Sequence, residues 1–120
     1  MALAVVRRFF SGSTDGLPIQ VARSSNASAT VHTGSTSTGV MDEIYMYAMM
    51  DVTRTAANTV IIQINSQCFT QEVPVGSVDF ALLTGFPLWG RSAAGTVVSV
   101  YASSTANLFV YGYVNRVTES

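Results

Sequence analysis

Two extended segments, residues 40–51 and 108–117, most constrain the fold that this chain can adopt, because both are apolar on two faces. In residues 108–117 (LFVYGYVNRV), a β-strand would put Leu and Val on one face and Phe109, Tyr111 and Tyr113 on the other. A strand of a two-sheet sandwich needs only one apolar face. A chain of 120 residues has little spare mass to cover the second face. The sequence therefore predicts a subunit that other subunits cover.

Residues 40–51 (VMDEIYMYAMMD) repeat the pattern, with Tyr45, Tyr47 and Met49 alternating with Ile, Met and Ala. A helix is the alternative, because Met, Ala and Glu favour helices. Nearly every residue from Ile44 to Met50 is apolar, however, which leaves no polar face for a surface helix. We therefore predict a strand here.

Turn signals divide the chain into about eight short strands, which predicts an all-β fold. We expect a β-sandwich, with a jelly roll as one option. Residues 103–107 are expected to be the loop of a β-hairpin, and residues 85–95 a structured apolar loop. The predicted strands are residues 17–23, 29–33, 40–51, 59–65, 68–75, 79–84, 96–102 and 108–117.

Residues 1–16 form an N-terminal arm, and residues 17–120 form the single sandwich domain. The arm carries Arg7, Arg8, Phe9 and Phe10, followed by a Gly/Ser/Thr/Asp hinge. Two exposed phenylalanines would suit a monomer poorly. The arm therefore either folds back as a strand or reaches onto a neighbouring subunit, and the sequence leaves both alternatives open.

Charged residues make up only 11% of the chain, against about 25% in typical soluble domains. All six basic residues are Arg, and the absence of Lys fits a mostly covered surface, unless it is an accident of composition. The net charge is −1 and no basic patch extends beyond Arg7 and Arg8, so we expect no nucleic-acid partner. No apolar stretch reaches the ~18 residues of a membrane span, so we expect no membrane partner.

Few residues suit catalysis or metal binding. His32, the only histidine, is predicted to be a hydrogen-bonded strand residue, because no nucleophile motif accompanies it. Asp42 and Glu43 would face opposite sides of a strand, so Asp42 is expected to close a turn and Glu43 to pair with an Arg. Cys68 is expected to be a small core residue. We predict no enzyme, no metal and no cofactor.

The tyrosines are the most informative side chains, because Tyr45 and Tyr47 share one strand face, as do Tyr111 and Tyr113. Tyrosine buries a large area, keeps one polar end and is favoured at protein interfaces. The alternatives are that these rings fill the domain's own core or stack on sugars. We favour an interface.

Three segments, read together, resemble a known family: residues 42–48 (DEIYMYA), 84–88 (TGFPL) and 110–117 (VYGYVNRV). They are similar to the small head decoration (cement) proteins of tailed bacteriophages, over about residues 21–117. The resemblance implies a trimer on the outer capsid surface, at junctions between capsomers. The arm and residues 89–94 lie outside the pattern.

The functional hypothesis is a structural virion protein on the outer capsid surface. It would stabilise the shell by bridging major capsid proteins, as a homo-oligomer that we expect to be a trimer. The alternative is a carbohydrate- or receptor-binding module, or a neck or tail accessory module, of the virion. The candidate interface residues are Arg7, Arg8, Phe9, Phe10, Tyr45, Tyr47, Phe86, Trp89, Tyr111 and Tyr113.

Overall fold

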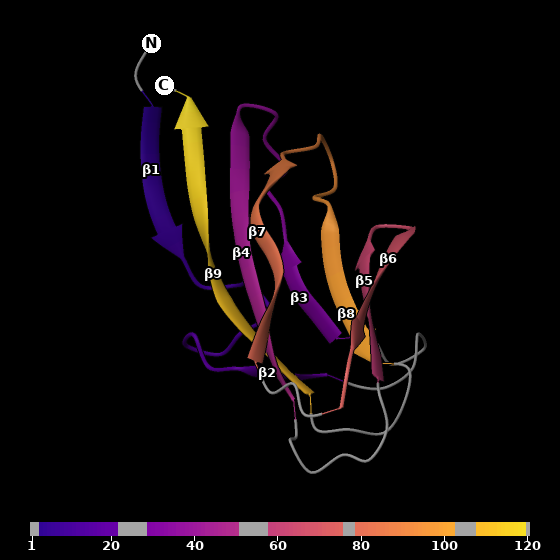
Figure 1. The fold of residues 1–120 in the computed structure, drawn as a ribbon. Coiled ribbons are helices and arrows are strands. Elements are labelled where there is room, and N and C mark those ends of the chain that lie inside the picture. The colour runs from indigo at the N-terminus through magenta and orange to yellow at the C-terminus, as the bar shows by residue number, and fades with distance from the viewer. Residues whose placement is uncertain (1–2, 22–28, 51–57, 76–78, 103–107, 120) are drawn as a thin grey trace.

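The computed structural model describes residues 3–21, 29–50, 58–75, 79–102 and 108–119, which form an all-β sandwich of two antiparallel sheets (Figure 1). No helix in this part of the chain is long and apolar enough to cross a membrane. Sheet A contains β1 (Leu3–Arg8), β9 (Leu108–Glu119), β4 (Val40–Met50) and β7 (Asp79–Trp89) in that order, with β2 (Ile19–Val21) also paired to β9. Sheet B contains β3 (Ala29–Thr33), β8 (Val97–Ala102), β5 (Asn58–Ile64) and β6 (Gln67–Val73) in that order.

Strands β2 to β9 pair in a nested order: β5 with β6, β4 with β7, β3 with β8 and β2 with β9. This is the strand order of a jelly roll, in which a long double ribbon winds into two facing sheets. The predicted hairpin between residues 96–102 and 108–117 is therefore wrong, because β8 and β9 lie in different sheets. Its predicted loop, residues 103–107, lies outside the described residues.

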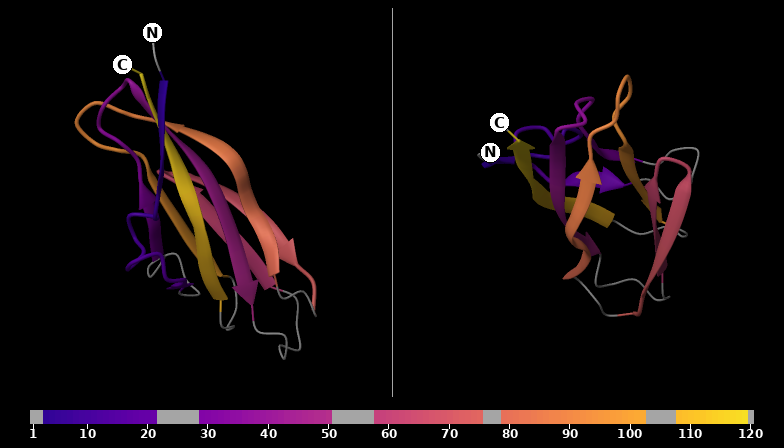
Figure 2. Two further views of the ribbon diagram at one scale, coloured as in Figure 1. Left: turned by 90° about the vertical axis from the view of Figure 1, so that its left-hand side faces the viewer. Right: turned by 90° about the horizontal axis from the view of Figure 1, so that it is seen from above.

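The core lies between the sheets and consists of the inward residues of each strand. The predicted alternation in residues 40–51 is confirmed, because Ile44, Met46, Ala48 and Met50 are all buried. Val60, Ile62, Val98 and Val100 pack against them from sheet B. Figure 2 shows from two further sides that the molecule is elongated, with extents of 52 × 23 × 22 Å.

The N-terminal segment folds back onto the sandwich, which is the first of the two alternatives, because β1 pairs antiparallel with β9. The prediction that Phe10 is an interface residue is wrong, since its side chain is 3% exposed and belongs to the core. Gly112 makes room for it. A Cβ at Gly112 would contact the Phe10 ring and would clash with the carbonyl oxygen of Tyr45 on β4.

Strand β7 continues through much of the segment that we predicted to be a loop, because residues 86–89 still pair with β4. The pairing register shifts beside Gly85, whose φ of +78° is one that glycine adopts readily. Pro87 is tolerated because β7 is an edge strand, where a missing N–H breaks no ladder hydrogen bond. A proline in an apolar run thus marks a sheet edge here.

Strand β6 forms the open edge of sheet B, and its residues 67–72 are exposed. Cys68 pairs with Gln63, so its side chain shares the outer side of the sheet with that residue. The prediction that Cys68 is a core residue is therefore wrong. An edge strand needs little apolar packing, so apolar Phe69 next to Cys68 did not indicate burial.

Candidate functional site

The outer face of sheet A, the side turned away from sheet B, carries an unusual number of apolar and aromatic side chains. Strand alternation and register place these residues at corresponding positions on four adjacent strands. We call this surface the outer face and define it by Leu3, Val5, Arg7, Met41, Glu43, Tyr45, Tyr47, Met49, Asp79, Ala81, Thr84, Pro87, Trp89, Phe109, Tyr111, Tyr113, Asn115 and Val117.

Four tyrosines form two stacked pairs at the centre of the outer face. Tyr45 pairs in register with Tyr113 and Tyr47 with Tyr111, across β4 and β9. The ring centroids are 5.0 Å apart in the first pair and 5.6 Å in the second, with interplanar angles of 20° and 27°. Each such aromatic pair contributes about 0.5–1.5 kcal/mol beyond its buried area.

Hydrogen bonds and a cation hold these rings in place. The Tyr45 hydroxyl donates to Glu43 Oε1 (2.6 Å), and the Tyr111 hydroxyl donates to Asp79 Oδ1 (2.7 Å). These two hydrogen bonds are the main cause of the raised pKa of each tyrosine. The Arg7 guanidinium lies 4.2 Å from the Tyr113 ring centroid. Since β9 lies between β1 and β4, Tyr113 has Arg7 on one side and Tyr45 on the other.

An exposed apolar patch continues the outer face toward one end of the molecule. Leu3 is 65% exposed and Trp89 is 61% exposed. Together with Gly39, Met41 and Val117 they line a cavity of about 360 Å³. Exposed large side chains gathered in one place are typical of an interaction surface.

The structure brings together six of the ten predicted interface residues and separates the other four. Arg7, Tyr45, Tyr47, Trp89, Tyr111 and Tyr113 belong to the outer face. Phe9 is exposed, but it lies beside Gly16 in the turn after β1. The prediction that Phe10 and Phe86 are interface residues is wrong. Phe10 is in the core, and Phe86 pairs with buried Ile44 and packs against the core from the inner side.

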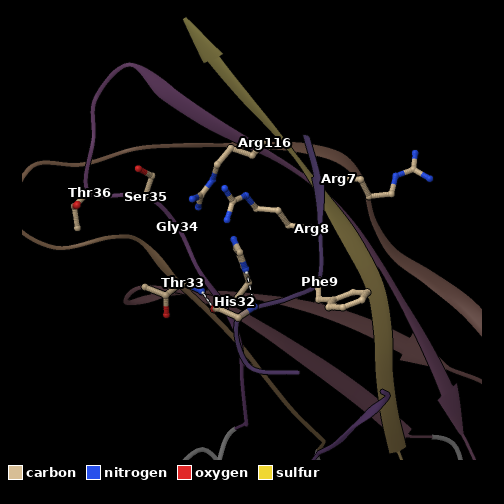
Figure 3. A pocket seen from close by; sticks show the side chains of 10 residues that line it. Arg7, Arg8, Phe9, His32, Thr33, Gly34, Ser35, Thr36 and Arg116 are labelled. Carbon is tan, nitrogen blue, oxygen red and sulfur yellow. Dashed lines mark hydrogen bonds between the residues drawn. The ribbon is translucent and has the colours of Figure 1, made fainter. Parts of the chain in front are cut away.

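Arg8, the tenth predicted residue, is exposed but faces the inner side of sheet A. Its register partner on β9 is Val114, which is fully buried. Arg8 and Arg116 both line a cavity of about 720 Å³ at the end of the sandwich (Figure 3). Neighbouring Arg7 faces the opposite side, so the Arg7-Arg8 pair does not act as one basic patch.

The sequence analysis missed a buried ionic cluster formed by His32, Asp42 and Arg116. Asp42 is fully buried, so the prediction that it closes a turn is wrong. Arg116 donates from Nε to Asp42 Oδ1 (2.7 Å) and from Nη2 to Asp42 Oδ2 (2.9 Å). Burial alone would raise the pKa of Asp42, but hydrogen bonds from Arg116 and His32 outweigh it and lower the pKa to about 2.

A signal for this cluster was present in the strand pattern. Asp42 is in phase with Ile44 and Met46, so alternation alone turns its carboxylate inward. Arg116 then lies directly opposite Asp42 on β9. The expectation that Glu43 pairs with an arginine is wrong, since among the described residues Glu43 forms no ion pair and accepts a hydrogen bond from the Tyr45 hydroxyl.

The hydrogen bonds of His32 support a structural role, and the prediction of a hydrogen-bonded strand residue is confirmed. The Ser11 backbone N–H donates to His32 Nδ1 (3.1 Å), so this nitrogen carries no hydrogen. His32 Nε2 therefore donates to Asp42 Oδ2 (2.7 Å). Both ring nitrogens are thus engaged, and neither is directed at a nucleophile.

A scan against models of known protein families finds no match, and a search of curated proteins finds no significant match. Among the described residues, no group of three or more His, Cys, Asp and Glu side chains could hold a metal ion.

Proposed function

We propose that this protein is a structural, non-enzymatic subunit of a bacteriophage virion, which binds the outer capsid surface as a homo-oligomer. The observation that carries the proposal is the continuous apolar and aromatic outer face of sheet A. Jelly rolls occur in viral structural proteins and also in lectins, so the fold alone does not decide between binding roles. The phage assignment itself rests on the resemblance of residues 42–48, 84–88 and 110–117.

The outer face has the chemistry of a protein contact. Its stacked tyrosines are held by Glu43, Asp79 and Arg7, so little side-chain entropy remains to be lost on binding. Aromatic residues and arginine are the side chains enriched in protein interfaces. A second copy of the chain and the major capsid protein are the two partners that we assign to this face, with a trimer as the expected assembly.

Strand β1 adds a second contact element. It pairs only with β9 among the described strands, which leaves its other edge open. Leu3, Val5 and Val6 on this strand are all exposed. An open edge with apolar side chains is a ready template for a strand from another chain. In this proposal the N-terminal segment contacts neighbours as an edge strand of the sandwich.

The experiment is a matched pair of leucine substitutions. Leu3→Asp places a charge on the outer face, whereas Leu17→Asp places one at a turn residue with nearly the same exposure, 65% against 62%. Light scattering should give an oligomer for the wild type and Leu17→Asp, and a smaller species for Leu3→Asp. A 12.8 kDa monomer for the wild type at micromolar concentration would contradict self-association.

Capsid binding is tested separately with particles that lack the protein. Wild type and Leu17→Asp should rebind and protect the particles against heat, and Leu3→Asp should rebind more weakly. Equal occupancy by all three proteins would exclude the outer face as the contact. No binding by the wild type would overturn the decoration role.

The carbohydrate-binding alternative depends on exposed Trp89, and its surroundings suit a sugar poorly. The cavity beside Trp89 is otherwise lined by Leu3, Gly39, Met41 and Val117, which offer no polar side chain to hold hydroxyl groups. The Tyr113 ring already has a neighbour on each side. We expect a glycan array probed with the wild type to give no hits, and a specific hit that Trp89→Ala abolishes would favour the alternative.

A further inference from the structure

We propose that the cavity at the end of the sandwich is a carboxylate-binding site, filled by an Asp or Glu side chain of a partner polypeptide. The cavity measures about 720 Å³ and lies on the inner side of sheet A, where β1, β9 and β4 extend beyond the strands of sheet B (Figures 1 and 3). It is distinct from the outer face, which lies on the other side of the same sheet. Its polar lining consists of Arg7, Arg8, Ser11, His32, Thr33, Ser35, Thr36 and Arg116.

Strand register places two guanidinium groups on the same wall of this cavity. Arg116 lies opposite Asp42 on β4, and Arg8 lies opposite Val114, so both face the inner side. Figure 3 shows the ends of both side chains above His32, whereas the guanidinium of Arg7 is directed away from the cavity. Guanidinium groups bind carboxylates through charge-assisted hydrogen bonds, often two at once.

Among the side chains directed into the cavity, which excludes the guanidinium of Arg7, one positive charge is left without a partner. Buried Asp42 neutralises Arg116, and His32 is neutral because its Nδ1 accepts from the Ser11 N–H. The Arg8 guanidinium has no ion pair or hydrogen bond with any described residue. None of the lining residues is acidic. A single net positive charge matches a carboxylate better than the double charge of a phosphate.

Two serine hydroxyl groups in the lining can donate a hydrogen bond. Ser11 Oγ accepts from the Thr33 backbone N–H (2.7 Å), and Ser35 Oγ accepts from the Ser37 backbone N–H (3.0 Å). Each serine oxygen is therefore already an acceptor, which leaves its hydrogen free to donate to a ligand. The lining thus offers donors from two arginines and two serines to one anionic group.

The size of the cavity favours a side chain on a peptide over a free ion. Pockets of about 300–1,000 Å³ hold ligands much larger than a simple anion. Arg8, Phe9 and Thr36 at its rim are exposed, so an extended segment could reach the guanidinium groups from solvent. The site would therefore recognise an acidic residue on a protruding loop or tail of another protein.

The test is an NMR titration of the ¹⁵N-labelled full chain with capped tripeptides at constant ionic strength. The Gly-Glu-Gly peptide should shift the backbone amides of Gly34, Ser35 and Thr36 in a saturable way. The uncharged Gly-Gln-Gly peptide should not. Inorganic phosphate is the third probe, and phosphate binding tighter than the glutamate peptide would overturn the carboxylate assignment.

Two arginine variants on adjacent positions of one strand provide the control. Arg8→Gln should weaken binding of the Gly-Glu-Gly peptide about tenfold, which corresponds to losing 1.4 kcal/mol. Arg7 also lines the cavity, but its guanidinium is directed away from it and lies over the Tyr113 ring, so Arg7→Gln makes the same charge change and should leave the affinity unchanged. Arg116 is not substituted, because its loss would leave the buried carboxylate of Asp42 without its charge partner. Equal affinity for wild type and Arg8→Gln, or no saturable shift with the wild type, would overturn the proposal whatever the outcome of the capsid experiments.

Discussion

Acidification should destabilise this fold through Asp42, which is fully buried between His32 and Arg116. The two partners lower the pKa of Asp42 to about 2 in the folded protein, against its ordinary value of 3.8. At 1.36 kcal/mol per pH unit, this difference corresponds to about 2 kcal/mol of stability. Because the folded-state pKa is the lower one, the contribution is complete above about pH 5 and is lost as the pH falls toward 2.

The perturbation that isolates this contribution is Asp42→Asn, which keeps the shape of the side chain and removes its titration. At pH 7 the variant should lose about 3 kcal/mol, because Arg116 loses its charge partner in a half-buried position. The assay is urea unfolding followed by circular dichroism from pH 2 to 7. The difference between wild type and variant should shrink by about 2 kcal/mol between pH 5 and pH 2.

A constant difference across that pH range would refute the reasoning, because it would mean that Asp42 has the same pKa in the folded and unfolded chain. Asp15→Asn is the matched control, since Asp15 is exposed in a turn and has no described ion-pair partner. At pH 7 it should change the free energy of unfolding by less than about 0.5 kcal/mol.

Three further experiments test the packing. Gly112→Ala should cost at least about 3 kcal/mol, because its Cβ would clash with the Tyr45 carbonyl oxygen at a φ of +142°; a melting temperature within about 2 °C of the wild type would contradict this. Phe10→Ala should cost about 3–5 kcal/mol in urea unfolding, and Phe9→Ala less than about 1 kcal/mol, since only Phe10 is buried; equal losses would show that β1 is not anchored through Phe10. Cys68 should react with a thiol reagent in native buffer, because it is exposed, and a requirement for denaturant would argue against its position on β6.

Local alternation predicted the part of the fold that depends on one strand at a time. Tyr45 and Tyr47 face outward and Ile44 and Met46 inward, as the two-residue period of a strand requires. The same two-residue period also predicts that Asp42 faces inward. That signal was overlooked because Asp follows a glycine-bounded loop here, where turns are common, and because burial of a carboxylate depends on partners distant in sequence.

Long-range pairing was beyond the reach of such patterns. A five-residue polar link suggested a hairpin between β8 and β9, yet the jelly roll sends the chain from sheet B to sheet A at that point. Phe86 and Trp89 were assigned to one loop, yet they belong to a strand with register shifts and face opposite sides. Phe10 packs closely against Gly112, about a hundred positions later, where a side chain would crowd its ring.

The nested strand order has a consequence for how the chain reaches this structure. Strand β9 lies between β4 on one side and β1 and β2 on the other, so the first and last described strands are neighbours. Contacts between distant parts of a chain form slowly, because a large loop must be ordered before they form. On the ribosome, β1, β2 and β4 must wait for residues 108–119 to emerge before sheet A can assemble, and their apolar edges stay open to aggregation until then.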